Sequence, residues 1–327
     1  MLADFPPPPA GKSGWPWDAP PPRTVGHGPK ISIIIPSLNQ GRFIEETIRS
    51  IVLQLWPDLE LIVIDAASRD ETVDVIRRYE PWISYWISER DGGQAEAINK
   101  GLAKATGDIV AWFNADDFFV DGIFAAVAAA WSRNPRGIYA APVVNFYRRG
   151  RETLIRPRGM TLENVVQYWT GRSRWHDPGL FWSRAVVDAA GGPDPSLHFS
   201  HDYDYLLRAL QHGSVEYVGH VAAGFRLHRD SKTMSQTEKM MAETAAVSQR
   251  YWHLVKSLDR AGFERAEYEA RVRRGASKLL RGRRGGLPLL WRSLKERPFV
   301  TPIRLASLFP AVLFERLGRL RSGRYLQ

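Results

Sequence analysis

The sequence contains no cysteine in its 327 residues. Without cysteine the protein cannot have disulfide bonds, a thiolate zinc site or a cysteine nucleophile. It also lacks any run of about 18 apolar residues, so no segment is expected to span a bilayer. The N-terminus, Met1 to Pro9, lacks the basic and apolar regions of a secretory signal. We therefore expect a cytoplasmic protein, either soluble or peripheral on the inner face of the plasma membrane.

A glycine-rich phosphate-binding loop is also missing. The first apolar run, Ile31 to Ile35, is typical of a buried strand, and clustered glycines follow such a strand in Rossmann and Walker proteins. Here the following loop, Pro36 to Gly41, has one glycine and no lysine. Any nucleotide must therefore be held in another way.

Acidic residues are scarce near the C-terminal end. Residues 271 to 327 contain 15 lysines and arginines and only two acids, Glu296 and Glu315. This segment carries +13, whereas the whole chain carries +10, so the first 270 residues carry −3. Two apolar clusters, Leu287 to Trp291 and Leu305 to Phe314, lie among these cations. Basic residues beside Trp and Phe are typical of peripheral attachment to an anionic membrane, although solvated helix faces carry similar charge.

Composition divides the chain into three parts. Residues 1–29 are proline-rich and cannot form a core alone, although Trp15 and Trp17 are expected to dock on the domain that follows. Residues 30–236 are expected to form one α/β domain. Residues 237–327 are expected to form a helical, basic extension, which begins with a long helical pattern from Thr237 to about Arg274.

Apolar runs alternate with helical patterns in the α/β part. Strands are predicted at the following runs: Ile31–Ile35, Glu60–Asp65, Ile83–Ser88, the run before Asn114, and Ile138–Tyr147. Between the first four, apolar residues recur at the spacing of amphipathic helices. Right-handed crossovers would place these strands in a parallel sheet with helices on both faces.

Three consecutive strands end in acidic loops, at Asp65, Asp91 and Asp116. The carboxyl ends of parallel strands meet at one edge of the sheet, where α/β proteins bind their ligands. The oxygens of Asn114-Ala115-Asp116-Asp117 suit Mg²⁺ or Mn²⁺, with open positions for a diphosphate. The alternative is that Asn114 and Asp117 cap a helix predicted at Asp121–Trp131.

Four motifs occur in the order typical of family-two inverting glycosyltransferases of the GT-A fold, and the chain resembles the bacterial surface-polysaccharide members. The motifs are Ser32–Gly41, Val63-Ile64-Asp65 followed by Ser68 and Asp70, Asn99-Lys100-Gly101, and Asn114–Asp117. The resemblance covers about residues 30 to 235. It implies a GT-A domain, with a mostly parallel sheet flanked by helices, and a nucleotide diphosphate sugar as donor.

The resemblance also implies roles for individual residues. The donor would contact Pro36, Ser37, Asn39, Asp65, Ser68, Asp91, Gln94, Asn114, Asp116 and Arg226. Asp116 would bind the cation, with His228 as a second metal ligand. The sequence departs from many relatives at Ala66 and Ala67, where Asp or Gly is common at the first position and Gly at the second. It also has Asn114 in place of an aspartate, which predicts weaker metal binding.

Two later segments match the acceptor side and the base of this family. His176 and Asp177 would face the acceptor, although a histidine beside aromatic residues is more often packed or solvated. Asp202 would be the catalytic base, with His201 in place of the more usual acid. The alternative for Asp202 is a place at a helix N-terminus, where a carboxylate favours the helix dipole.

Together, the residues and the resemblance predict a metal-dependent, inverting hexosyltransferase. It would move a sugar to a hydroxyl of a lipid-linked glycan in cell-surface polysaccharide synthesis. Two alternatives stay open, a nucleotide-sugar-binding protein without turnover and a sugar-nucleotide pyrophosphorylase, although the latter normally begins with a basic, glycine-rich loop. A basic tail also suits nucleic-acid binding, but that class does not explain four ordered motifs, and no nucleic-acid partner is expected.

Overall fold

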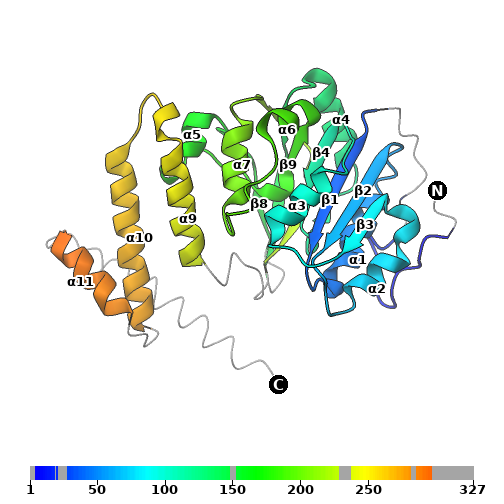
Figure 1. The fold of residues 1–327 in the computed structure, drawn as a ribbon, viewed down its shortest axis with the longest axis horizontal. Helices are drawn as coiled ribbons and strands as arrows, with labels where there is room; N and C mark the ends of the chain where they lie inside the picture. Colours follow the sequence, from blue (N-terminus) through cyan, green and yellow to red (C-terminus); the bar gives the residue numbers. More distant parts are fainter. Residues whose placement is uncertain are drawn as a thin grey trace. The chain divides into compact units, whose positions relative to one another are not determined.

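The computed structural model describes residues 4–18, 20, 28–147, 152–227, 237–280 and 285–296. The chain forms two compact units, Met1–Lys256 and Ser257–Gln327. The first contains two β-sheets and the helices around them (Figure 1). The second contains helices α10, Arg260–Leu280, and α11, Gly286–Glu296. Among the described helices, none combines the length and apolar composition that crossing a bilayer requires.

The central sheet of the first unit has seven strands in the order β10-β6-β9-β4-β1-β2-β3. In that order the strands are Val215–Tyr217, Ile138–Ala140, Leu180–Ser183, Ile109–Trp112, Ile31–Ser37, Leu59–Asp65 and Tyr85–Ser88. All neighbouring pairs are parallel except those of β9, which is antiparallel to β4 and β6. Ile33 and Ile35 enter one apolar core and Ile34 the other, since side chains alternate across a strand. The predicted mostly parallel sheet is confirmed.

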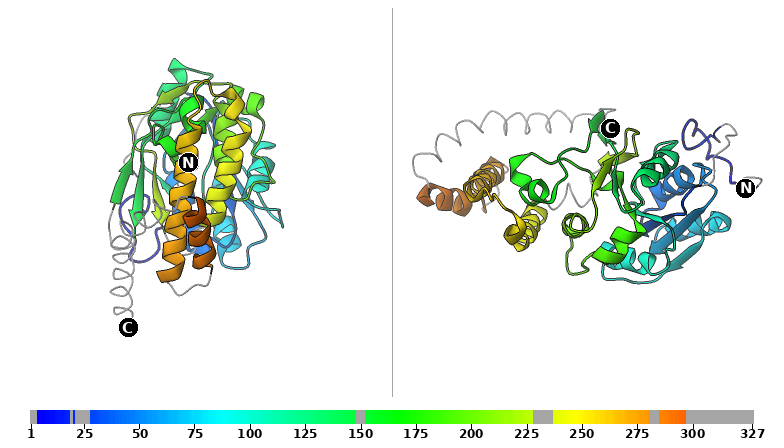
Figure 2. Two further views of the ribbon diagram at one scale, coloured as in Figure 1. Left: turned by 90° about the vertical axis from the view of Figure 1, so that its left-hand side faces the viewer. Right: turned by 90° about the horizontal axis from the view of Figure 1, so that it is seen from above.

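Helices cover both faces of this sheet (Figure 2). One core contains residues of α1 (Gly41–Val52), α2 (Thr72–Arg78) and α4 (Ile123–Arg133). The opposite core contains residues of α3 (Gln94–Leu102), α5 (Leu162–Val166), α6 (Arg184–Ala190), α7 (His201–Ala209) and α9 (Thr237–Arg250). The helical spacing of Ile44, Ile48, Ile51 and Leu55 predicted the buried face of α1 correctly for the first three, which are fully buried. Leu55 does not belong to this face, because the helix ends at Val52.

A second, smaller sheet has the order β5-β11-β7-β8. Its strands are Phe118–Phe119, Ala223–Leu227, Val143–Tyr147 and Glu152–Ile155. The prediction of one strand over Ile138–Tyr147 is wrong, because the chain divides there into β6 and β7, which belong to different sheets. Pro142 lies at the division and has no N–H for a ladder, while its carbonyl accepts the Ala222 N–H at 2.7 Å.

The long helix predicted from Thr237 to Arg274 is also wrong, because two helices, α9 and α10, occupy this range. The 3₁₀ turn Trp252–Leu254 and a short loop lie between them. Asp259 ends the loop, since its Oδ1 accepts the Gly262 N–H at 2.7 Å in the manner of a helix N-cap. The apolar spacing in the sequence therefore did not reveal the break between α9 and α10.

The N-terminal segment is held by a buried arginine on α1. The Arg49 side chain is only 2% exposed and donates to three carbonyls of that segment, those of Pro6, Pro16 and Trp17, at 2.7 to 3.1 Å. Its guanidinium also lies 4.8 Å from the centre of the Phe5 ring. The Trp15 indole N–H donates to the Phe119 carbonyl at 2.7 Å, and Trp17 is buried. The expected docking of both tryptophans is confirmed.

We expect Arg49→Met to lower the free energy of unfolding by about 3 kcal/mol, because three carbonyls, in two buried hydrogen bonds and one part-buried one, lose a charged donor. Urea denaturation of the two proteins measures this difference. The control is Arg78→Met, whose half-exposed side chain pairs with Glu45 at 3.5 Å and contributes less than about 1 kcal/mol. An equal effect of the two substitutions would show that the N-terminal segment does not stabilise the fold.

Candidate functional site

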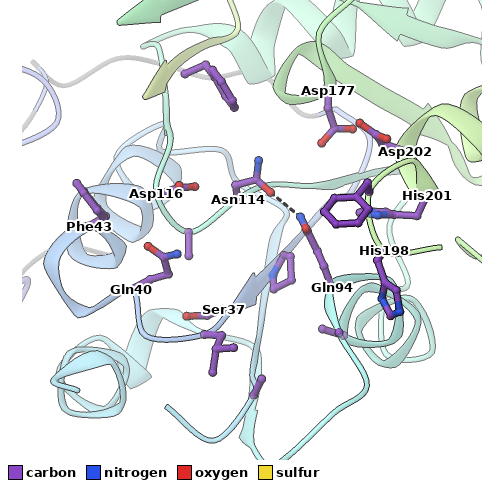
Figure 3. Close-up of a pocket in the computed structure, with 18 of the residues that line it drawn as sticks. Ser37, Gln40, Phe43, Gln94, Asn114, Asp116, Asp177, His198, His201 and Asp202 are labelled. Atoms are coloured by element: carbon purple, nitrogen blue, oxygen red, sulfur yellow. Dashed lines mark hydrogen bonds between the residues drawn. The ribbon is translucent and has the colours of Figure 1, made fainter. Parts of the chain in front are cut away.

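A pocket of about 810 Å³ opens where β1 and β4 end. The residues that line it come from loops after these strands, from the small sheet and from the start of α7 (Figure 3). Ten of the residues proposed from the sequence line this pocket: Pro36, Ser37, Asn39, Asp91, Gln94, Asn114, Asp116, His176, Asp177 and Asp202. Asp65, Ser68 and Arg226 do not line it, and His228 lies outside the described residues.

Asp65 holds the loops that form one side of the pocket. Its carboxylate accepts hydrogen bonds from the Ser68 N–H at 2.9 Å and from the Ser88 hydroxyl at 2.6 Å. The Ser68 hydroxyl in turn accepts the Asn39 N–H at 2.7 Å. Ala67 has φ +57°, a left-handed conformation that glycine would adopt without strain. The chain therefore keeps a tight turn at this departure from the family pattern, despite the missing glycine.

Two buried oxygens in this half of the pocket have no hydrogen-bond partner among the described residues, Ser37 Oγ and Asp91 Oδ2. The other oxygen of Asp91 accepts the Gly93 N–H at 2.9 Å. Burial raises the pKa of Asp91 above its ordinary value. Buried polar atoms are normally satisfied, so these two oxygens are suited to hydrogen-bond a ligand.

The third motif, Asn99-Lys100-Gly101, shapes α3 and does not reach the pocket. Gly101 lets α3 approach β1, because a Cβ there would lie 2.3 Å from an Ile34 side-chain carbon. The Asn99 amide donates to the Pro193 carbonyl at 2.8 Å, and Lys100 pairs with Glu89 at 2.8 Å. This motif thus supports the scaffold under the site.

Asp117 is fully buried and fixes the acidic loop after β4. Its carboxylate accepts the Arg226 N–H at 2.9 Å and the Asn114 amide at 3.3 Å. Burial raises the pKa of Asp117 well above its ordinary value, and the neighbouring Asp116 charge raises it further. Helix α4 begins after Gly122, which lacks a side-chain cap. The alternative that Asn114 and Asp117 cap this helix is therefore wrong.

A polar stripe on α1 holds the same loop from the other side. The Thr47 hydroxyl contacts the carbonyls of Ala115 and Asp117 at 3.0 and 2.6 Å. The Ser50 hydroxyl accepts the Phe119 N–H at 3.0 Å. Arg226 closes the arrangement, since it donates to the Asp116 carbonyl at 2.6 Å and pairs with Glu46. The guanidinium of Arg226 is thus already engaged beneath the pocket.

Asp116 presents its carboxylate at the pocket surface (Figure 3). The nearby Asn114 oxygen accepts the Gln94 amide at 2.7 Å. In the part of the chain that the structure describes, no three His, Asp or Glu side chains come close enough to hold a cation among themselves. This donor set fits Mg²⁺ or Mn²⁺ only as a cation bound by one carboxylate together with ligand phosphates, a common arrangement for Mg²⁺.

Across the pocket, the carboxylates of Asp177 and Asp202 turn toward each other (Figure 3). Asp177 begins the 3₁₀ turn Asp177–Gly179, and Asp202 lies in the first turn of α7. Burial raises the pKa of both groups, and the Asp202 charge raises that of Asp177 further. Two adjacent buried carboxylates ionise with difficulty, so this pair tends to retain one proton.

His176 packs against the Phe225 ring, with ring centres 4.4 Å apart, and it also lines the pocket. Burial lowers the pKa of His176 to about 4, so the imidazole is neutral at pH 7. His176 therefore packs against an aromatic residue and also lines the pocket.

Glu243 of α9 holds the loop that leads to Asp202. Its carboxylate accepts three consecutive backbone N–H groups, from His198 at 3.1 Å and from Phe199 and Ser200 at 2.7 Å each. The negative charge of Glu243 also raises the pKa of Asp202, whereas His201 lowers it. The helical pattern around Glu243 in the sequence did not indicate this contact.

Several pocket residues were given no role from the sequence. They are Gln40, Arg42, Phe43, Asn145, Trp175, His198, Phe199, Phe225 and Met240. Asn145 is the least expected, because it comes from β7, which was predicted as the end of a longer strand. Trp175 and Phe199 could have been suspected from their positions next to His176 and close to His201.

Comparisons with known proteins agree with this architecture. The model of the family described as glycosyl transferase family 2 matches residues 32–186. An uncharacterized glycosyltransferase of Mycobacterium tuberculosis is 30% identical over 187 residues, which cover 55% of this chain and 69% of that protein. The putative teichuronic acid biosynthesis glycosyltransferase TuaG of Bacillus subtilis is 38% identical over 92 residues, 27% of this chain and 36% of that protein.

Two solved structures share the fold. The mannosyltransferase PcManGT from Pyrobaculum calidifontis, in complex with GDP-Man and Mn²⁺, has a TM-score of 0.56 at 18% identity and covers 88% of this chain and 81% of its own. The structure of residues 1-349 of Staphylococcus aureus TarS in complex with UDP-GlcNAc has a TM-score of 0.53 at 17% identity. The match covers 71% of this chain and 69% of that chain. These likenesses show a GT-A fold, and together with the sequence matches they establish that the chain belongs to glycosyl transferase family 2.

Proposed function

We propose that the protein transfers a hexose from a nucleotide diphosphate sugar to a hydroxyl of a lipid-linked glycan, with inversion at the anomeric carbon. The observation that carries this proposal is the arrangement of one pocket, in which Asp116 lies on one side and the Asp177–Asp202 pair on the other (Figure 3). A direct displacement requires charge neutralisation at the leaving group, which a cation held by a carboxylate would supply, and a base near the acceptor hydroxyl.

The donor would lie over the loops after β1 and β3. Ser37 Oγ and Asp91 Oδ2 are available for hydroxyl or N–H groups of the nucleoside, because no described residue bonds them. Asn39 lines the same half of the pocket, and Asp65 and Ser68 would act by holding its backbone. The complexes of relatives with UDP-GlcNAc and GDP-Man support a sugar nucleotide as ligand.

Asp116 would hold Mg²⁺ or Mn²⁺ together with the diphosphate oxygens. The bound cation would neutralise charge on the departing diphosphate. Arg226 keeps the Asp116 backbone in place through its 2.6 Å hydrogen bond, so its contribution to donor binding would be indirect. The role of His228 stays a prediction.

The acceptor would enter along the aromatic wall that Trp175, Phe199 and Phe225 contribute to the pocket. The acceptor hydroxyl would attack the anomeric carbon as Asp202 takes its proton, and the bond from that carbon to the diphosphate oxygen would break with its electron pair. The raised pKa of Asp202 makes it a stronger base as long as the pH stays above that pKa. A relative assigned to teichuronic acid biosynthesis supports a surface glycan as acceptor.

We expect Asp116→Asn to keep the fold and to lower metal-dependent release of nucleoside diphosphate by on the order of 100-fold, because the amide no longer offsets the cation's charge. Purified protein is incubated with a panel of nucleotide sugars and Mn²⁺ or Mg²⁺, and free nucleoside diphosphate is measured. Asp188→Asn is the matched control, since Asp188 is an exposed carboxylate of α6. Undiminished metal-stimulated release in Asp116→Asn would rule out this assignment.

We expect Asp202→Asn to bind donor nearly as well as the unchanged protein while sugar transfer falls by a factor on the order of 10² to 10⁴. Donor affinity is measured by calorimetry and transfer by product formation under single-turnover conditions. Loss of donor affinity with normal transfer per bound donor would assign the base elsewhere. Donor binding without transfer or hydrolysis in the unchanged protein, across the whole panel, would instead favour a binding protein.

We expect Glu243→Gln to lower kcat about tenfold, because a neutral amide cannot accept all three backbone N–H groups and the loop before Asp202 shifts. It should also move the acidic limb of the pH–rate profile to lower pH. Glu243 raises the pKa of Asp202, so removing its charge lowers that pKa and keeps the base ionised in more acidic solution. His201, which lowers the pKa of Asp202, is unchanged in this variant. A lower rate with an unshifted limb would indicate a purely structural role.

A further inference from the structure

The second compact unit exposes large apolar side chains on one helix. Across the described ranges, the exposed large hydrophobic residues are Leu38, Tyr217, Leu254, Leu279, Leu287 and Trp291. The two most exposed are Leu287, at 64%, and Trp291, at 61%. They are four residues apart on α11, so they share one face of that helix.

Other residues of α11 pack on α10. Gly275 admits Leu290, because a Cβ at Gly275 would lie 2.7 Å from the Leu290 side chain. Ser293 is buried and accepts the Arg271 guanidinium at 3.1 Å, and Arg271 also pairs with Glu296. Figure 2 shows the two helices side by side. The face with Leu287 and Trp291 is therefore not needed to hold this helix pair together.

Cations border the exposed face. The Arg292 side chain is 73% exposed, and the Lys295 ammonium lies 5.7 Å from the centre of the Trp291 ring. Residues 271 to 327 as a whole carry +13. An apolar helix face with a tryptophan and flanking Lys and Arg is the composition of helices that lie in the interface of an anionic membrane.

We propose that this face of α11, formed by Leu287, Trp291, Arg292 and Lys295, docks the protein on an anionic phospholipid surface. Leu287 and Trp291 enter the region between headgroups and acyl chains, and Arg292 and Lys295 contact headgroup phosphates. The inference rests on the proposed function in one respect: docking would give the enzyme access to a lipid-linked acceptor.

A lipid surface fits this face better than a second copy of the chain. Two copies that met through it would bring Arg292 and Lys295 of each toward the other, and like charges facing each other are unfavourable. Two apolar side chains are also far fewer than the 20 to 30 residues that each side of a stable protein interface contributes, on the order of 800 Å². Anionic headgroups neutralise the same cations.

The test uses the full chain and vesicles of phosphatidylcholine, with or without an equal amount of phosphatidylglycerol. At low salt we expect sedimentation with the anionic vesicles only, and release at high salt because salt screens the headgroup charge. Leu287→Gln with Trp291→Gln should lower the partition coefficient at least about tenfold. The matched control is Leu254→Gln, which removes an exposed leucine of the first unit and should bind as the unchanged protein does.

Arg292→Gln with Lys295→Gln should also weaken binding and reduce its salt dependence. This second variant decides the question if the apolar double variant loses its helical circular dichroism. Trp291→Phe should retain most of the binding, because the ring stays available for the interface. Because these assays contain no donor, failure of sugar transfer leaves their result unaffected.

Equal binding of the unchanged protein and of both double variants would overturn the proposal. So would binding to phosphatidylcholine alone that is as strong as binding to the anionic vesicles. A dimer in analytical ultracentrifugation that dissociates in the Leu287→Gln, Trp291→Gln variant, with unchanged vesicle binding, would assign the face to a second copy.

Discussion

The buried carboxylate of Asp117 joins the parts of the molecule that must meet at the site. It follows β4 of the large sheet and accepts the Arg226 N–H of β11 in the small sheet. Burying a carboxylate is costly unless its oxygens accept hydrogen bonds, so Asp117 keeps the loop after β4 and the backbone of β11 in a fixed arrangement. Asp116 reaches the pocket surface because its neighbour is fixed in this way.

Helix α1 supports the same part of the chain from behind through Thr47 and Ser50, and Gln54, just after the helix, donates to the Val120 carbonyl. The other face of α1 carries Arg49, which binds the N-terminal segment. One amphipathic helix therefore has apolar residues for the core, a polar stripe for the acidic loop and a buried cation for the proline-rich segment.

The side of the pocket that carries Asp202 is held by a different part of the chain. Glu243 fixes the loop before α7, and Tyr251 donates to Asp204 of α7 at 2.9 Å. Among the described elements α9 comes next after β11, so only residues 228–236 separate the strand that supports Asp116 from the helix that supports Asp202. The two sides of the pocket are thus connected by a short stretch of sequence.

The sequence by itself determined the α/β character, the buried face of α1, and ten residues of the pocket. The first two depend on local periodicity. Asp91, Asn114 and Asp116 were expected from strand ends, which parallel strands bring to one edge of the sheet. The other seven pocket residues were expected only from the resemblance to the motifs of a known family. Only the tertiary structure decided that Pro142 divides one apolar run between two sheets, that Arg226 lies beneath the pocket, and that Glu243 and Asn145 belong to the site. These features arise from contacts between residues far apart in the chain, and hydrophobic periodicity carries no information about which distant polar groups will meet.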